Sequence, residues 1–132
     1  MRRLFLSVVL FFGFESSVFA DSPLTSTQIS SAYKNVPVVS DMLEELTLSN
    51  DFMDFLIDPK VPIDVKIAII HALGWENMEP RSTVETFFKY INADNKYINF
   101  DDFIDKASGD LLICMAYLKA LDNYFEVDEA IK

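Results

Sequence analysis

Apolar residues recur every three to four positions along most of the chain, which places them on one face of an α-helix. The longest example lies between residues 110 and 125. Its apolar stripe consists of Leu111, Cys114, Met115, Leu118, Leu121 and Phe125. No segment has the clean two-residue alternation that is typical of a half-buried strand. We therefore expect an all-α fold, a small compact bundle of about six helices joined by short connections.

Polar residues and helix breakers divide this pattern into elements. A serine or asparagine side chain just before a helix accepts a hydrogen bond from an N–H group of the first turn, and Ser82 also begins the capping-box pattern S/T-x-x-E. The predicted caps are Ser40, Ser49 or Asn50, Ser82 and Asn99. They begin helices over 41–48, 51–58, 82–91 and 100–107. A weaker helix over 27–35 should end at Val36-Pro37, because the residue before a proline disfavours the α conformation.

One segment, 62–73, is apolar on nearly all sides. Pro62 suits a first helical turn, where its missing N–H group is not needed, and Gly74 can adopt the left-handed conformation that ends a helix. A helix without a polar face belongs in the centre of a domain. We therefore expect this helix to form the middle of the core, and residues 127–132 to form a last helical turn or a frayed end.

Several residues coincide when the chain is shifted by 48 positions. The aligned pairs are Phe52 with Phe100, Asp54 with Asp102, Phe55 with Phe103, Ala68 with Ala116, Ala72 with Ala120 and Leu73 with Leu121. This period is close to the roughly 40–47 residues of HEAT-like helical pairs. The pattern predicts either two such pairs with a concave protein-binding face, or two ordinary helical hairpins in a compact bundle.

The chain begins like a secretory signal peptide. Arg2 and Arg3 precede an apolar run of about eleven residues, and Val18-Phe19-Ala20 offers a cleavage site before Asp21. A membrane-spanning helix needs about 20 apolar residues, so we expect cleavage after export by the general secretory route and no stable membrane anchor. The paired arginines also resemble a twin-arginine leader. The predicted organisation is a cleaved leader over 1–20, a flexible polar segment over 21–35 and one helical domain over 36–132, located in the periplasm or secreted.

The part of the chain that remains after cleavage is strongly acidic. It keeps 9 Lys and Arg (11 minus Arg2 and Arg3) and 20 Asp and Glu (21 minus Glu15), a net charge of −11. A field of this sign repels nucleic-acid phosphates and anionic lipids and attracts basic protein surfaces. We therefore expect a basic protein partner and no nucleic acid. The acids that we expect to contact this partner are Asp101, Asp102, Asp105, Glu126, Asp128 and Glu129.

Residues that could support catalysis or bind a metal are few. Cys114 is the only cysteine and lies on the apolar stripe, which predicts a buried, unreactive thiol. His71 is the only histidine and shares one edge of its helix with Asp64 and Trp75. We expect it to pack beside the tryptophan rather than to act as a base or a ligand. Because no nucleophile, base and orienting group form a set, we expect no enzymatic activity, no metal and no cofactor.

The segment 91–102 lies between two predicted helices, as an EF-hand calcium loop does. Its second half resembles such a loop, but its key ligand positions do not. The first is Ile91, the third is Ala93, and the sixth, which should be glycine, is Lys96. We therefore expect a polar connection in which Asn99 caps the next helix.

These expectations favour binding over catalysis. The leading interpretation is an exported acidic helical module that binds a basic protein. An example would be an inhibitor or immunity-type protein that neutralises a basic toxin or hydrolase of the cell envelope. The alternative is a protein that binds a small molecule or a divalent cation through the loop at 91–102 or in a gap between the aromatic helices.

Overall fold

Seven helices account for the regular structure of residues 27–74 and 82–123, which are the residues that the computed structural model describes. They are α3 (Ile29–Ala32), α4 (Pro37–Glu45), α5 (Asn50–Ile57), α6 (Ile63–Ala72), α7 (Thr83–Ile91), α8 (Phe100–Lys106) and α9 (Gly109–Asp122). No strand occurs in these two ranges, and the all-α prediction is confirmed. None of the described helices is both long and apolar enough to cross a membrane. The predicted leader at 1–20 lies outside the described residues.

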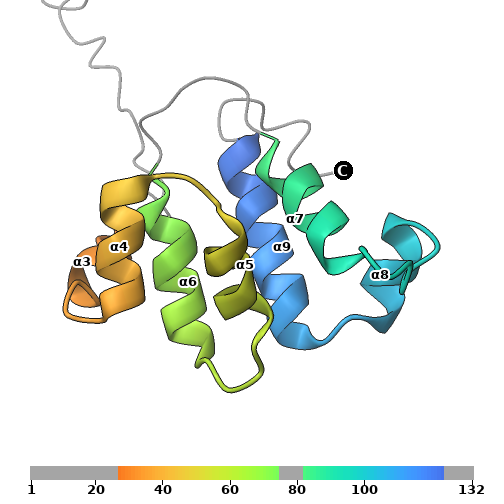
Figure 1. Cartoon of the computed structure of the whole chain (residues 1–132), viewed down its shortest axis with the longest axis horizontal. Coiled ribbons are helices and arrows are strands. Elements are labelled where there is room, and N and C mark those ends of the chain that lie inside the picture. The colour runs from red at the N-terminus through yellow and green to blue at the C-terminus, as the bar shows by residue number, and fades with distance from the viewer. Residues whose placement is uncertain (1–26, 75–81, 124–132) are drawn as a thin grey trace, which may run out of the picture.

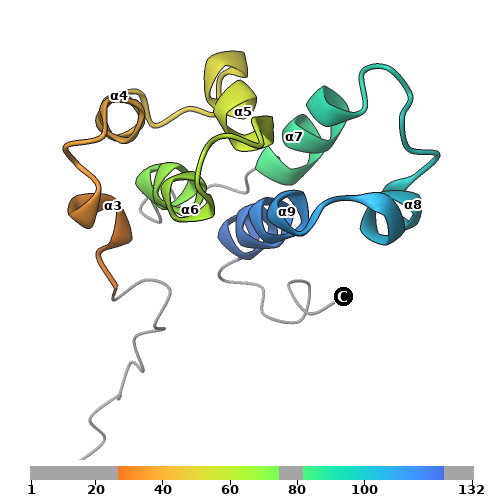
Figure 2. The same cartoon turned by 90° about the horizontal axis from the view of Figure 1, so that it is seen from below.

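The helices form two layers (Figures 1 and 2). In Figure 2, α4, α5 and α7 lie above α6 and α9, while α3 and α8 lie toward the two ends. α6 packs against α3, α4, α5 and α9, and Ala68, Ile69 and Ile70 of this helix are fully buried. The prediction that the apolar helix forms the middle of the core is therefore confirmed.

Several predicted boundaries are also confirmed. α5 follows Ser49, but the Ser49 side chain makes no capping hydrogen bond and Asn50 lies inside the helix, so the boundary is right while the predicted cap is not formed. α6 follows Pro62, and Gly74 has a left-handed φ of 75° just after α6. The Asn99 side chain accepts a hydrogen bond from the Asp102 N–H group at 2.9 Å and so caps α8. At Pro62, Gly74 and Asn99 the local residues favour the boundary that the structure shows.

α9 carries the predicted apolar stripe and a second buried position beside it. Within the described residues, the most deeply buried side chains of the stripe are Cys114, Met115, Leu118 and Leu121. Tyr117, which lies off the stripe, is also buried at 8% exposure. α9 is therefore covered on more than one side, by α6 and by α7. Phe125 and the predicted turn at 127–132 lie outside the described residues.

α4 begins earlier than the sequence predicts. Ser40 lies inside this helix, and the helix begins at Pro37, where a missing N–H group leaves no hydrogen bond unmade. The predicted cap at Ser40 is therefore wrong, because the proline starts a helix at this point. The weak helix before it is only the four residues of α3. α4 also ends early, since Leu46 adopts a left-handed φ of 51°.

The capping box predicted before α7 does not form. Ser82 makes no capping hydrogen bond through its side chain. Instead, the Asp122 carboxylate at the end of α9 accepts hydrogen bonds from the Thr83 hydroxyl at 2.5 Å and from the Val84 N–H group at 2.9 Å. A negative charge is favoured at this end of a helix. A contact between distant parts of the chain thus replaces the local cap.

The arrangement of helices repeats once, but not in the predicted register. α4 packs against α6 and α7 packs against α9, and α7 and α9 begin 46 residues after α4 and α6. The predicted shift of 48 residues pairs Phe55, which is 41% exposed, with the fully buried Phe103. It also pairs the buried Ala68 with the exposed Ala116. The 48-residue alignment is therefore wrong, although the structure does contain two stacked helix pairs.

Candidate functional site

Aromatic side chains hold α8 at one end of the molecule. Phe103 of α8 is fully buried and forms edge-to-face contacts with Phe88 of α7 and with Tyr97, at ring-centroid distances of 5.9 and 5.1 Å. Phe88 also contacts Phe100, at 5.5 Å. Such ring pairs are favourable beyond the area they bury. They fix which side of α8 faces the core and therefore which side remains exposed.

The three acidic residues predicted on α8 have different roles. Asp101 and Asp105 are exposed and, being four residues apart, lie on the same side of the helix. Asp102 belongs to the local structure: it forms an ion pair with Lys106 at 2.5 Å and accepts a hydrogen bond from the Ile98 N–H group at 3.1 Å. The hydrogen bond from Lys106, followed by that from Ile98, lowers the pKa of Asp102. The other acids that we predicted to contact a partner lie outside the described residues: Glu126, Asp128 and Glu129.

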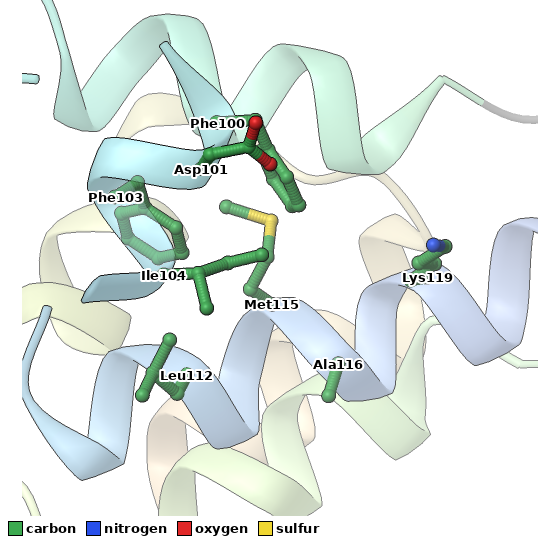
Figure 3. Close-up of a pocket in the computed structure, with 8 residues that line it drawn as sticks. All are labelled: Phe100, Asp101, Phe103, Ile104, Leu112, Met115, Ala116 and Lys119. Carbon is green, nitrogen blue, oxygen red and sulfur yellow. The ribbon is translucent and has the colours of Figure 1, made fainter. Parts of the chain in front are cut away.

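An apolar hollow of about 370 Å³ lies between α8 and α9 (Figure 3); we call it the α8–α9 hollow. It is lined by Phe100, Asp101, Phe103, Ile104, Leu112, Met115, Ala116 and Lys119. Figure 3 shows Met115 of α9 pointing toward α8, and Ile104 is 49% exposed. The hollow therefore combines an apolar wall with the carboxylate of Asp101 and the ammonium group of Lys119. Its Asp101 side suits an apolar side chain that has a basic group beside it.

A second apolar hollow, of about 450 Å³, lies where α3, α6 and α9 meet; we call it the α3–α6–α9 hollow. Its lining residues are Ile29, Ile67, Ile113, Ala116, Tyr117 and Ala120. Ala116 lines both hollows. The sequence analysis missed this surface, because we assigned one apolar stripe to α9. Residues 113, 116, 117 and 120 form a second stripe at helical spacing, and that signal could have indicated it.

The loop before α8 uses its polar groups internally. The Asn92 side chain accepts a hydrogen bond from the Tyr97 N–H group at 2.7 Å and donates one to the Tyr97 carbonyl at 3.0 Å. The Lys96 ammonium lies 5.1 Å from the centre of the Tyr97 ring. In the described ranges, no group of three or more His, Cys, Asp or Glu residues could hold a metal ion.

His71 links α6 to α3. Its Nδ1 atom lies 2.9 Å from the hydroxyl oxygen of Ser30 and 3.4 Å from the backbone nitrogen of the same residue. Burial lowers the pKa of His71. Asp64 is also a residue of α6, and its carboxylate accepts a hydrogen bond from the Tyr33 hydroxyl at 2.7 Å. Both polar residues thus fasten α3 to α6, while the predicted neighbour Trp75 lies outside the described residues.

The core also contains a charged residue that the sequence analysis missed. The Lys66 side chain is 1% exposed, and its Nζ atom lies 3.3 Å from the carboxylate of Asp110. Cys114 is fully buried, and burial raises the pKa of its thiol to about 11. The prediction that this thiol is buried is confirmed, and its raised pKa disfavours the thiolate, which is the reactive form of cysteine.

Comparisons of this chain with family models, with curated proteins and with solved structures gave no match. The functional interpretation therefore rests on the geometry described above. Its two main features are the exposed acids of α8 beside the α8–α9 hollow, and the α3–α6–α9 hollow on another side of α9.

Proposed function

We propose that this chain is an exported, acidic, helical binding protein whose partner is a basic protein. One observation carries the proposal: exposed carboxylates and an apolar hollow occur together at the same end of the molecule. Asp101 lines the α8–α9 hollow, and Asp105 lies one turn further along the same side of α8. These are two of the acids that the sequence analysis predicted for partner binding.

The two parts of this surface would have different roles in binding. An aliphatic or aromatic side chain of the partner fills the α8–α9 hollow, since buried apolar anchors account for most of the affinity at protein interfaces. Lysine or arginine residues beside that anchor contact Asp101 and Asp105. Such charge pairs mainly accelerate association and exclude wrong partners.

The charge of the domain supports a basic partner. The described residues contain 7 Lys and Arg and 14 Asp and Glu, a net charge of −7. This field attracts a positively charged surface from a distance of about 8 Å at physiological salt. Export is inferred from the leader pattern at 1–20, which implies a partner in the periplasm or outside the cell. If that partner is a toxin or hydrolase, the protein acts as an inhibitor or immunity-type protein.

The test is a binding experiment with the mature chain, residues 21–132, as tagged bait in an envelope extract at low and at high salt. We expect a basic protein to be retained at low salt and released at high salt. The double variant Asp101→Lys/Asp105→Lys should lower its retention by about tenfold or more, because like charges at an interface cost several kcal/mol.

A matched control is Asp41→Lys/Glu44→Lys on α4. Both residues are exposed, and this variant changes the net charge by the same amount. It should retain the partner nearly as well as the unchanged chain does. Equal loss in both variants would show that only overall charge matters, and no basic protein at low salt would remove the proposal altogether.

A further inference from the structure

We infer that the partner places an amphipathic helix in the α8–α9 hollow, with a basic residue against Asp101 and an acidic residue against Lys119. This inference rests on the proposed function, since it describes the segment that the basic partner would present to the same hollow. Three observations carry it: the length of the apolar wall, the helical character of both walls, and the two opposite charges among the lining residues.

The α9 wall of the hollow is a strip that is two helical turns long. It consists of Leu112, Met115, Ala116 and Lys119, and residues three or four apart lie on the same side of a helix. From Leu112 to Lys119 the strip extends about 10 Å along the helix axis. Two apolar side chains of a partner helix, at positions i and i+4, lie about 6 Å apart along their own axis. The strip therefore has room for two such anchors.

The walls of the hollow favour a helical segment over an extended one. Both walls are helices, so they offer no strand edge to which an extended segment could add. Among the described residues that line the hollow, only Asp101 and Lys119 have polar side chains. An extended segment buried here would leave backbone N–H and C=O groups without partners, which is costly. A helix satisfies these groups internally and presents its apolar anchors on one side.

Asp101 and Lys119 give the hollow one charge of each sign. Asp101 is exposed, Lys119 is partly exposed, and neither side chain forms an ion pair with another described residue. Figure 3 shows Asp101 on α8 and Lys119 on α9, beyond Ala116. A partner segment with basic residues alone would set like charge against Lys119, and this lowers affinity. An acidic residue in the segment removes the repulsion and pairs with the ammonium group.

A second copy of this chain fits the hollow less well. Two copies related by a two-fold axis would match Asp101 of each with Lys119 of the other. However, the described residues of each copy carry a net charge of −7, and this repulsion opposes association. We expect light scattering to show that the mature chain is a monomer. A dimer that Lys119→Glu disrupts would identify the second copy as the occupant and overturn the inference.

Selection from two displayed peptide libraries, with the mature chain as bait, tests the inference. One library holds helix-forming peptides of about 18 residues, a length at which isolated helices are stable enough to form. Each peptide has two leucines at i and i+4, with Lys, Glu or Ala at the positions around them. The second library holds peptides of the same length that contain regularly spaced prolines and cannot form a helix.

We expect enrichment from the helical library, and the enriched peptides should carry both a lysine and a glutamate beside the leucines. Enrichment from the proline library alone would overturn the inference. Helical peptides enriched with lysine alone, or no enrichment from either library, would overturn it as well.

Lys119→Glu should change which charges are selected. The enriched peptides should bind this variant about fivefold more weakly or worse, because an attraction becomes a repulsion at a partly exposed site. A fresh selection on the variant should yield lysine in place of the glutamate. Circular dichroism checks that the variant is folded, and Lys119→Gln, which only removes the charge, should show a smaller loss in the same direction.

A matched control is Lys34→Glu, which changes the net charge by the same amount. Lys34 is exposed between α3 and α4, at the other end of the molecule from α8 (Figure 2). This variant should bind the enriched peptides as well as the unchanged chain does. Equal losses in Lys119→Glu and Lys34→Glu would contradict the inference.

Failure of this inference and failure of the proposed function give different results. A basic protein that is retained from the extract, but that none of the helical peptides displaces, would overturn the inference and leave the proposed function standing. If the extract yields no basic protein at all, the proposed function and the inference fail together.

Discussion

The contact between the end of α9 and the start of α7 provides a quantitative test of how this fold is stabilised. Asp122→Ala removes two hydrogen bonds to a carboxylate, from the Thr83 hydroxyl and the Val84 N–H group. A helix cap contributes about 1 kcal/mol, and a hydrogen bond to a charged group contributes about 1.5–3 kcal/mol. Both hydrogen bonds are partly buried, so we expect the free energy of unfolding to fall by about 2–3 kcal/mol. Ser82→Ala should cost less than about 0.5 kcal/mol, because Ser82 makes no capping hydrogen bond.

Urea unfolding followed by far-UV circular dichroism measures these differences. With a slope of about 2 kcal/mol per molar urea, Asp122→Ala should lower the unfolding midpoint by about 1 M or more. Asp122→Asn keeps an acceptor but loses the charge, so its cost should be intermediate, about 1 kcal/mol. The reasoning would be refuted if Ser82→Ala cost as much as Asp122→Ala, because the local capping box would then be the working cap.

Two further perturbations follow from the core. Asp110→Asn should lower the free energy of unfolding by about 2 kcal/mol. This is less than the roughly 3–5 kcal/mol expected when one partner of a fully buried ion pair is removed, because Asp110 is 45% exposed. Lys66→Met should be nearly neutral, because it replaces the buried charge with an apolar side chain of similar size. Urea unfolding of the double variant should show that the cost of Asp110→Asn largely vanishes without the lysine, and an unchanged cost would count against the ion pair. Stability should also fall as the pH drops below about 6.5, because the unfolded chain takes up a proton there while the folded state holds the pKa of His71 lower. Urea midpoints across this range should decline less in His71→Gln, and equal declines would contradict the prediction.

The helices were predictable wherever one face of the element meets the core. The spacing of apolar residues gave the position of α9, since burial follows directly from that spacing. Polar residues and helix breakers gave the positions of α5, α6 and α8. The start of α4 was not predictable from the sequence, because Val36-Pro37 can end one helix or begin another. Val38 and Val39 are buried in the core, and this packing favours a helix that begins at Pro37. The cap of α7 was also beyond local reasoning. Its carboxylate comes from Asp122, 39 residues further along the chain.

The candidate site was predicted in composition but not in geometry. The sequence indicates acids on the helix after Asn99, but it does not distinguish Asp101 from Asp102. The structure does, because Lys106 and the Ile98 N–H group bind the Asp102 carboxylate. The positions and linings of the two hollows were not predicted. They arise from the way α9 sits between α6 and α8, and no pattern within a single helix contains that information.

Ala116 is the residue that connects the two sides of this molecule. It lines both hollows, and α9 lies between α6 on one side and α8 on the other (Figure 2). A displacement of α9 toward α8 would narrow the α8–α9 hollow and widen the α3–α6–α9 hollow. Occupants on the two sides would therefore influence each other through the position of one helix, without touching. Thermodynamic reciprocity requires that each change the affinity of the other by the same factor.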